Sequence, residues 1–195
     1  MRILHTSDWH LGRQLHGVSL LDDQRHVLGQ IVELVEARGV DVVLIAGDLY
    51  DRSVPPAGAI ALLDETIEAI NQRLGVPVVM IAGNHDGPER MAAFAKPLER
   101  AGVYVRGPLA PEPAPVVLAD AHGDVAFHPL PYAEPATVRD VLGDDVHGHE
   151  GAIAAQLERV AAYEAAHAPA GRRCVVVSHC FLDGAGYFLQ AEFRT

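Results

Sequence analysis

Residues 41–48 read Asp-Val-Val-Leu-Ile-Ala-Gly-Asp (DVVLIAGD), and this stretch gives the strongest indication of the fold class. Its five consecutive apolar residues are typical of a strand that is buried on both faces, because a strand with one wet face alternates apolar and polar side chains. Gly47 then permits a sharp turn, and Asp48 follows just past the carboxyl end of the strand. The stretch predicts a strand that is buried on both faces of its sheet.

Helical periodicity flanks this strand on both sides. Before it, a helix from Asp22 to a stop at Gly39 would turn one stripe inward, namely Val27, Leu28, Ile31, Leu34 and Val35. After it, a helix that starts near Pro55-Pro56 would do the same with Ile60, Leu63, Ile67 and Ile70. Residues 1–6 and the stretch VPVVMIAGNHD at 76–86 repeat the plan of a strand followed by a polar turn.

The second half of the chain has a different pattern. A helix from Pro88 is interrupted or kinked by Pro97, because proline lacks an amide donor. The segment from 115 to 131 predicts a hairpin with a His-Gly turn. The remaining expected elements are a strand at 103–106, a Pro-rich loop at 107–115, an Ala-rich helix at 150–167 and a buried strand in RRCVVVSHC. We expect a single-domain α/β layered fold with mixed sheets.

Composition narrows the class of protein. The chain has 195 residues, of which 49% are apolar, and this favours one globular domain with a substantial core. The formal charge of −11 argues against simple electrostatic binding to nucleic acid. No apolar segment of signal-peptide type follows Arg2, and Cys174 and Cys180 are expected to be buried small hydrophobes, so we expect a cytoplasmic protein.

Metal-binding side chains follow four of the expected strands. In chain order they are Asp8 and His10, then Asp48, then Asn84 and His85, then His179. The carboxyl ends of parallel strands meet at one edge of a sheet, so these side chains should converge. Carboxylate, imidazole and amide oxygen without thiolate favour Mn²⁺ or Fe²⁺, with Zn²⁺ possible. Asp48 is central in this order and is the candidate to bridge two metal ions.

The motifs together resemble a known family. DWH, GDLYD and GNHD are similar to the motifs of calcineurin-like metallophosphoesterases, and HTSDWHLG and AGDLYDRSVPP narrow the resemblance to the SbcD family. The resemblance runs from Met1 to about Phe181. It implies a metallophosphoesterase α/β sandwich and a Mn²⁺-dependent nuclease of DNA ends, with 3′–5′ exonuclease and single-strand endonuclease activity. The implied partners are DNA, an SbcC-type ATPase and a second copy in a homodimer.

The resemblance also assigns roles to the candidate residues. Asp8 and His10 would bind the first of two Mn²⁺ ions, and Asp48 would bridge both. Asn84 and His179 would bind the second ion. His85 would be the catalytic residue that contacts the phosphate and protonates the leaving 3′ oxygen.

One expected motif is missing from the chain. The family carries a later G-H-x-H motif that completes both metal shells, and none follows SHCF at 178–181. The H-x-H at 147–149 lies upstream of that strand and is expected to be a solvated loop. We therefore expect a C-terminally truncated domain that lacks the final metal-ligand motif and the capping domain, and that binds metal weakly.

Two other functions stay open at this point. A small-molecule phosphodiesterase or phosphatase would use the same metal core and would suit the acidic charge, and an inactive remnant would keep only the fold. Structural roles are favoured for Asp51, in a turn or behind the metal ligands, and for Asp86, as the cap of the helix at Pro88. Core packing is favoured over base stacking for Trp9 and Tyr50.

Overall fold

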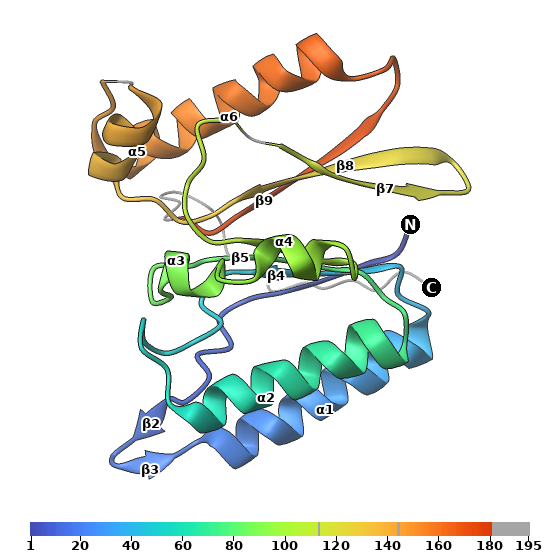
Figure 1. The fold of residues 1–195 in the computed structure, drawn as a ribbon, viewed down its shortest axis with the longest axis vertical. Coiled ribbons are helices and arrows are strands. Elements are labelled where there is room, and N and C mark those ends of the chain that lie inside the picture. The colour runs from blue at the N-terminus through green and yellow to red at the C-terminus, as the bar shows by residue number, and fades with distance from the viewer. Residues whose placement is uncertain (113, 144, 181–195) are drawn as a thin grey trace.

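A computed structural model describes residues 1–112, 114–143 and 145–180 of the chain. Its two main sheets pack face to face, and helices cover the outer face of each (Figure 1). The first sheet has the order β1-β4-β5-β6, and the second has the order β7-β8-β9. The expected α/β sandwich is therefore confirmed, although only the second of the two main sheets is mixed.

The first sheet is parallel throughout. Its strands are β1 (Ile3–Thr6), β4 (Val42–Ala46), β5 (Val78–Ile81) and β6 (Val103–Arg106). Between β1 and β4 the chain forms a small hairpin, β2 (Gln14–Leu15) and β3 (Val18–Ser19), and then α1 (Leu21–Arg38). Between β4 and β5 it forms α2 (Ala57–Ile67), which continues as a π-helical turn, η1 (Glu68–Arg73). All four strands run the same way, so their carboxyl ends lie at one edge.

The central strand β4 is buried along its whole length, and alternate residues serve two different cores. Val43 and Ile45 pack toward α1 and α2, against a cluster that includes Leu28 and Leu62. Val42, Leu44 and Ala46 pack on the second sheet instead. A continuous apolar run is required because each face of the strand packs against an apolar layer that excludes water.

The helix stripes differ from the expected ones in part. Leu28, Val35 and Ile70 are buried as expected, but Val27 is 51% exposed and Ile60 is 48% exposed. Leu34 is also exposed. Small and polar residues at the same helical spacing, Ala59 and Thr66, take the inward positions of α2, because a short side chain lets the helix approach the sheet closely.

The second sheet combines an antiparallel and a parallel pair. β7 (Val116–Asp120) and β8 (Gly123–Leu130) form the expected hairpin. Its turn is at Ala121-His122 and not at the expected His-Gly pair, because Gly123 pairs with Asp120 as the first residue of β8. β8 pairs in parallel with β9 (Arg173–Ser178). Phe127 of β8 is fully buried between the two sheets. The outer face carries α5 (Pro135–Leu142) and α6 (Gly148–His167), as Figure 1 shows.

The expectations about the burial of β9 and about the helix from Pro88 have different outcomes. The expected burial of β9 is wrong, because the strand lies at the edge of its sheet and only Val177 is fully enclosed; Cys174 is exposed and Cys180 is half-buried. The helix from Pro88 is interrupted by Pro97 as expected, and the break lies just before the proline. α3 (Pro88–Met91) ends, and α4 (Ala95–Glu99) starts anew with Pro97 in its first turn, because the proline ring would clash with the carbonyl group of residue 93 in a continuous helix.

Candidate metal centre

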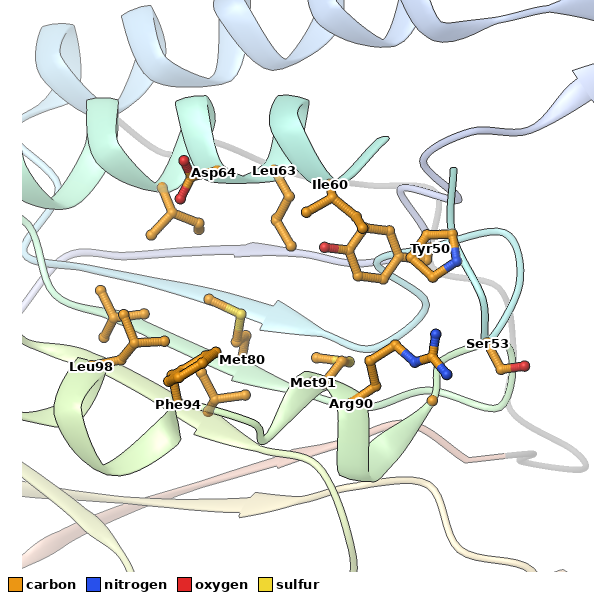
Figure 2. Close-up of a pocket in the computed structure, with 15 residues that line it drawn as sticks. Tyr50, Ser53, Ile60, Leu63, Asp64, Met80, Arg90, Met91, Phe94 and Leu98 are labelled. Carbon is orange, nitrogen blue, oxygen red and sulfur yellow. The ribbon is translucent and has the colours of Figure 1, made fainter. Parts of the chain in front are cut away.

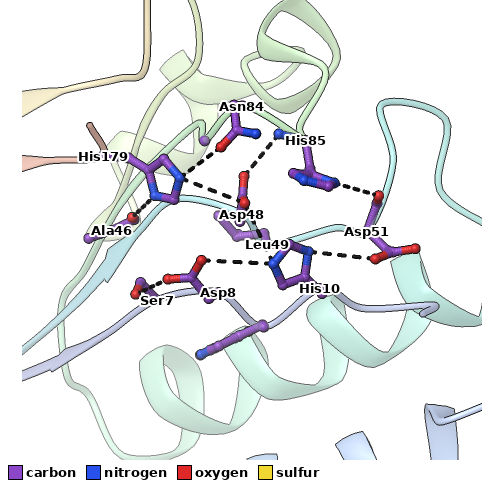
Figure 3. Close-up of polar contacts among 12 residues, drawn as sticks. Ser7, Asp8, His10, Ala46, Asp48, Leu49, Asp51, Asn84, His85 and His179 are labelled. Atoms are coloured by element: carbon purple, nitrogen blue, oxygen red, sulfur yellow. Dashed lines mark hydrogen bonds and ion pairs between the residues drawn. The ribbon is translucent and has the colours of Figure 1, made fainter. Parts of the chain in front are cut away.

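The predicted site residues come together at the carboxyl edge of the first sheet (Figure 3). Asp8 and His10 follow β1, Asp48 follows β4, and Asn84 and His85 follow β5. A sixth side chain, that of His179, reaches the same place from the end of β9 in the other sheet. Both sheets of the sandwich therefore contribute to one cluster of oxygen and nitrogen donors.

The loop after β1 has an unusual backbone that presents two of these side chains. Asp8 and His10 have positive φ angles of 57° and 44°, a conformation that costs energy for residues other than glycine. Gln24 of α1 holds the loop: its side-chain amide donates to the carbonyl oxygens of Trp9 and His10 at 3.1 and 2.8 Å. The helix thus fixes the conformation that directs both side chains into the cluster.

Asp48 occupies the centre of the cluster and is almost fully buried. Its Oδ2 atom lies 3.6 Å from Nε2 of His10 and 3.7 Å from Nε2 of His179. Its other oxygen, Oδ1, accepts a hydrogen bond of 2.9 Å from the backbone N–H of His85. Asp48 also has a positive φ, of 52°. One carboxylate is therefore shared between two imidazoles that come from opposite sheets.

Two glycines allow the ligand loops to approach this closely. A Cβ atom on Gly83 would overlap Oδ1 of Asp48, and one on Gly47 would lie 2.6 Å from the ring of His179. Neither approach is sterically possible. The glycines of the A-G-D and A-G-N stretches are thus required by the side chains that pack against them. The φ of 92° at Gly47 is a second reason for glycine at that position, because other residues rarely adopt this conformation.

His179 and Asn84 present their lone pairs to each other. Nδ1 of His179 lies 2.8 Å from the carbonyl oxygen of Ala46, so this nitrogen carries the proton and donates. Nε2 is then an acceptor, yet it lies 3.0 Å from the amide oxygen Oδ1 of Asn84. Two acceptors at this distance suit a cation that binds both. The donor set, which is carboxylate, imidazole and amide oxygen, is also that of a divalent metal site.

His85 is exposed and oriented by the loop after β4. Its Nδ1 lies 3.0 Å from the backbone carbonyl oxygen of Asp51, so Nδ1 donates and Nε2 is left as the outward nitrogen. Its ring packs edge-to-face on that of His10, with 4.8 Å between the centroids. The carboxylate of Asp51 lies 3.6 Å from Nδ1 of His10. Asp51 thus contacts two site histidines, in agreement with the expected role of a residue that orients the metal ligands without binding metal itself.

The expectation that Asp86 caps the helix at Pro88 is wrong. The residue before α3 is Gly87, and among the described residues no side chain caps that helix. The buried carboxylate of Asp86 instead accepts hydrogen bonds from the backbone N–H groups of Leu49, Tyr50 and Gly83 at 2.9 to 3.1 Å. Burial raises the pKa of Asp86, although these bonds oppose the rise. Asp86 therefore ties the Asp48 loop to the Asn84 loop.

Two residues beside the site have no role there that was predicted from the sequence. Tyr132 lies next to His179, and His149 lies next to Tyr132. His147 is 87% exposed, as expected for the H-x-H stretch, but His149 is half-buried in the first turn of α6. Only the tertiary packing of α6 against the end of β9 brings these rings to the metal centre, so local sequence patterns carry no signal for them.

A second group of potential ligands lies away from this edge. His128, Glu164 and Cys174 approach one another between β8, α6 and β9. Arg172, however, donates to both oxygens of Glu164 at 2.6 and 3.2 Å, and Nε2 of the buried His128 lies 2.7 Å from the same carboxylate. The Arg172 charge lowers the pKa of Glu164. This group is an ion-pair network that attaches α6 to the sheet.

Comparison with known proteins gives a consistent picture. The family model described as calcineurin-like phosphoesterase matches residues 1–191. A protein of Staphylococcus saprophyticus, named as the D component of the nuclease SbcCD, is 40% identical over 164 residues, which are 84% of this chain and 42% of that protein. The protein of the same name from Staphylococcus epidermidis is 43% identical over 144 residues, 74% of this chain and 37% of that protein.

The chain thus spans about two fifths of the length of the curated relatives it matches. Among the described residues, no helix is both long enough and apolar enough to cross a membrane.

Proposed function

The chain belongs to the calcineurin-like phosphoesterase family, and on this premise we propose that it hydrolyses phosphodiester bonds at DNA ends with two divalent metal ions. The observation that carries the proposal is the position of Asp48, whose single oxygen Oδ2 lies 3.6 to 3.7 Å from histidines on opposite sides. A shared carboxylate of this kind is what a two-metal site needs. The family depends on divalent metals, and we propose Mn²⁺ as the physiological one.

The proposed ligands follow from the two sides of Asp48. Asp8 and His10 would hold one metal ion together with Asp48, and Asn84 and His179 would hold the other. When bound, the metal ions supply an activated water and neutralise the charge of the phosphate. Asp51 and Gln24 keep His10 in place, and the carbonyl oxygen of Ala46 orients the ring of His179 through Nδ1, so the ligands are preorganised.

His85 is the proposed general acid. Its Nδ1 donates to the carbonyl oxygen of Asp51, so in the imidazolium form Nε2 carries the second proton, and from there it would contact the phosphate and protonate the leaving 3′ oxygen. The side chain is exposed beside the cluster, where a substrate could reach it. Its backbone N–H donates to Asp48, so the proposed general acid and the proposed bridging ligand keep a fixed position relative to each other.

We further propose that residues 1–195 form a single nuclease domain of SbcD type, which acts with an SbcC-type ATPase. This rests on the names of the two relatives, both of which are called the D component of the SbcCD nuclease. A cytoplasmic location is part of the proposal, because a nuclease of DNA ends meets its substrate there. The acidic charge of −11 fits a protein whose contact with DNA depends on metal ions and a partner.

A homodimer is also proposed, through the apolar cavity in Figure 2. The cavity has a volume of about 300 Å³ and lies between α2 and the α3–α4 segment, with Leu63, Met80 and Met91 in its lining. Phe94 lines the cavity from the α3–α4 segment and is 77% exposed, and Ile60 lines it from α2 and is 48% exposed (Figure 2). A two-fold axis would let the protruding ring of each copy enter the hollow of the other. Phe94→Asp should abolish the dimer in sedimentation experiments.

The decisive experiment compares two substrates with Mn²⁺ present and with the protein in excess. A 3′-labelled DNA duplex tests the nuclease, and bis-p-nitrophenyl phosphate tests the small-molecule phosphodiesterase. We expect slow cleavage of DNA that Asp48→Ala and His85→Ala remove, while His26→Ala on the outer face of α1 has no effect. Cleavage of the small ester alone, with intact DNA, would favour the second function, and cleavage of neither would favour an inactive remnant.

A further inference from the structure

Tyr132 is anchored to the loop that carries Asn84. It follows β8 by two residues, and its backbone N–H donates a 2.9 Å hydrogen bond to the carbonyl oxygen of Ala82. Ala82 directly precedes Gly83 and Asn84. The position of the Tyr132 backbone is therefore fixed relative to the centre, although the residue belongs to the second sheet and the centre is built mainly on the first.

The ring of Tyr132 borders the proposed ligands of the second metal ion. Its centroid lies 6.3 Å from that of His179, and the two rings are nearly perpendicular, at 80°. On the α6 side, the ring of His149 lies 6.1 Å away and is tilted by 31°. Tyr132 and His149 are both half-buried, so part of each ring remains open to solvent. An aromatic border thus extends outward from His179.

The chemistry of Tyr132 limits what it can do there. Its hydroxyl group donates a 2.7 Å hydrogen bond to Oε1 of Glu134. Burial, together with this bond and the charge of Glu134, raises the pKa of Tyr132 to about 12. The phenol stays neutral at physiological pH and its proton is engaged elsewhere. It is neither a general base nor a nucleophile, and its flat apolar ring is the feature it offers a substrate.

We propose that Tyr132 is a specificity-determining residue, whose ring, bordered by His149, stacks on the base of the nucleotide next to the scissile phosphate. The inference rests on the proposed function, because it requires a nucleotide substrate. If a phosphate lies between His85 and His179, the base of the adjoining nucleotide is one sugar away from it. The rings of Tyr132 and His149 lie on the His179 side of that phosphate, where this base could stack. Stacking accepts every base, as an enzyme that degrades DNA ends of any sequence requires.

The test compares two oligonucleotide duplexes that differ only in the 3′-terminal residue, which is thymidine in one and an abasic tetrahydrofuran in the other. Tyr132→Leu keeps the apolar bulk and removes the aromatic face, and Tyr132→Phe keeps the face. Tyr163→Leu on α6 is the matched control, because its ring stacks on His167 at the far end of that helix. Cleavage with Mn²⁺ is one readout. Fluorescence anisotropy in a His85→Ala background, where cleavage is blocked, is the second.

We expect Tyr132→Leu to weaken cleavage and binding of the thymidine duplex by about 5- to 100-fold and to leave the abasic duplex within about 2-fold, since stacking energies are of that order. Tyr132→Phe and Tyr163→Leu should match the parent protein. An equal loss on both duplexes would overturn the inference, because the ring would then only support His179, and so would no loss on either. If bis-p-nitrophenyl phosphate is cleaved and neither duplex is, both the proposed nuclease function and the inference about Tyr132 fail.

Discussion

Nε2 of His179 lies 3.0 Å from Oδ1 of Asn84, although both atoms are acceptors when Nδ1 of His179 donates to Ala46. The same nitrogen lies 3.7 Å from Oδ2 of Asp48. Three atoms with lone pairs, carried by residues that follow three different strands, thus face one point. A bound cation would relieve their mutual repulsion, so metal binding and stability should be linked.

The first prediction concerns that linkage. At about 100 times its dissociation constant, Mn²⁺ should stabilise the chain by roughly 2.7 kcal/mol, which is about 5–10 °C in Tm for a domain of this size. Asn84→Ala should remove much of this shift, and Asn84→Asp should retain it because a carboxylate replaces the amide oxygen. Thermal melting with and without Mn²⁺ measures the effect. An unchanged shift in Asn84→Ala would exclude this residue as a ligand.

The second prediction concerns Gly83. A Cβ atom there would overlap both the carboxylate and the backbone nitrogen of Asp48. Gly83→Ala should therefore displace Asp48 and weaken Mn²⁺ binding by about 10- to 100-fold, the range for lost supporting contacts at metal sites. Gly29→Ala is the control. Gly29 lies in α1 with open space around it, so alanine there should raise stability by about 0.5–1 kcal/mol and leave metal binding unchanged.

The third prediction concerns Asp86. Removal of its carboxylate in Asp86→Ala leaves three backbone N–H groups in a buried place without their acceptor. The expected cost is about 3 kcal/mol or more, or roughly 6–12 °C in Tm. Asp86→Asn should lose less, because its amide oxygen still accepts and no charge is buried. Equal melting temperatures for the alanine and asparagine variants would contradict this view of the loop connection.

The fourth prediction concerns acid stability. The side chain of Arg173, the N-terminal ammonium group and the N–H of His122 hold the pKa of Asp120 well below its usual range. The folded protein therefore binds this proton less readily than the unfolded chain does. The contribution of Asp120 is fully present above the unfolded pKa of about 3.9 and is lost as the pH falls below it.

Asp120→Asn should accordingly flatten the decline of Tm between about pH 5 and pH 2. Asp124→Asn, at an exposed position on the same hairpin, is the control and should keep the decline of the parent protein. Melting curves at a series of pH values give the comparison. A decline in Asp120→Asn as steep as in the parent protein would mean that other carboxylates dominate acid unfolding.

Much of the fold could be predicted because its strongest signals are local. The apolar run at 42–46 predicts a strand that is buried on both faces, and β4 is such a strand. Gly39 predicts the end of the preceding helix, and it ends α1 in a left-handed conformation. The burial predicted for Val27 and Ile60 is wrong because periodicity alone does not say which side of a broad apolar stripe faces the sheet. Cys174 could not be placed either, since its exposure depends on the position of β9 at the edge of its sheet.

The candidate site divides in the same way. Asp8, His10, Asp48, Asn84, His85 and His179 could be found because each stands directly after a strand, and the structure brings them together. The role of Asp86 was missed because its partners are backbone N–H groups, which sequence patterns do not reveal. Tyr132 was missed, and the expectation of a solvated loop was wrong for His149, because only the packing of α6 on the second sheet carries these residues to the metal centre.

Whether Asp48 is shared between two metal ions can be decided by the amount of Mn²⁺ bound by the purified chain and by its Asp48→Ala variant. Titration followed by electron paramagnetic resonance reports both the number of ions and any magnetic coupling between neighbours. We predict binding by the parent chain, a coupled signal once a second ion is bound, and loss of both features in Asp48→Ala. Retention of the same Mn²⁺ affinity and coupling by Asp48→Ala would contradict the assignment of Asp48 as the bridging ligand.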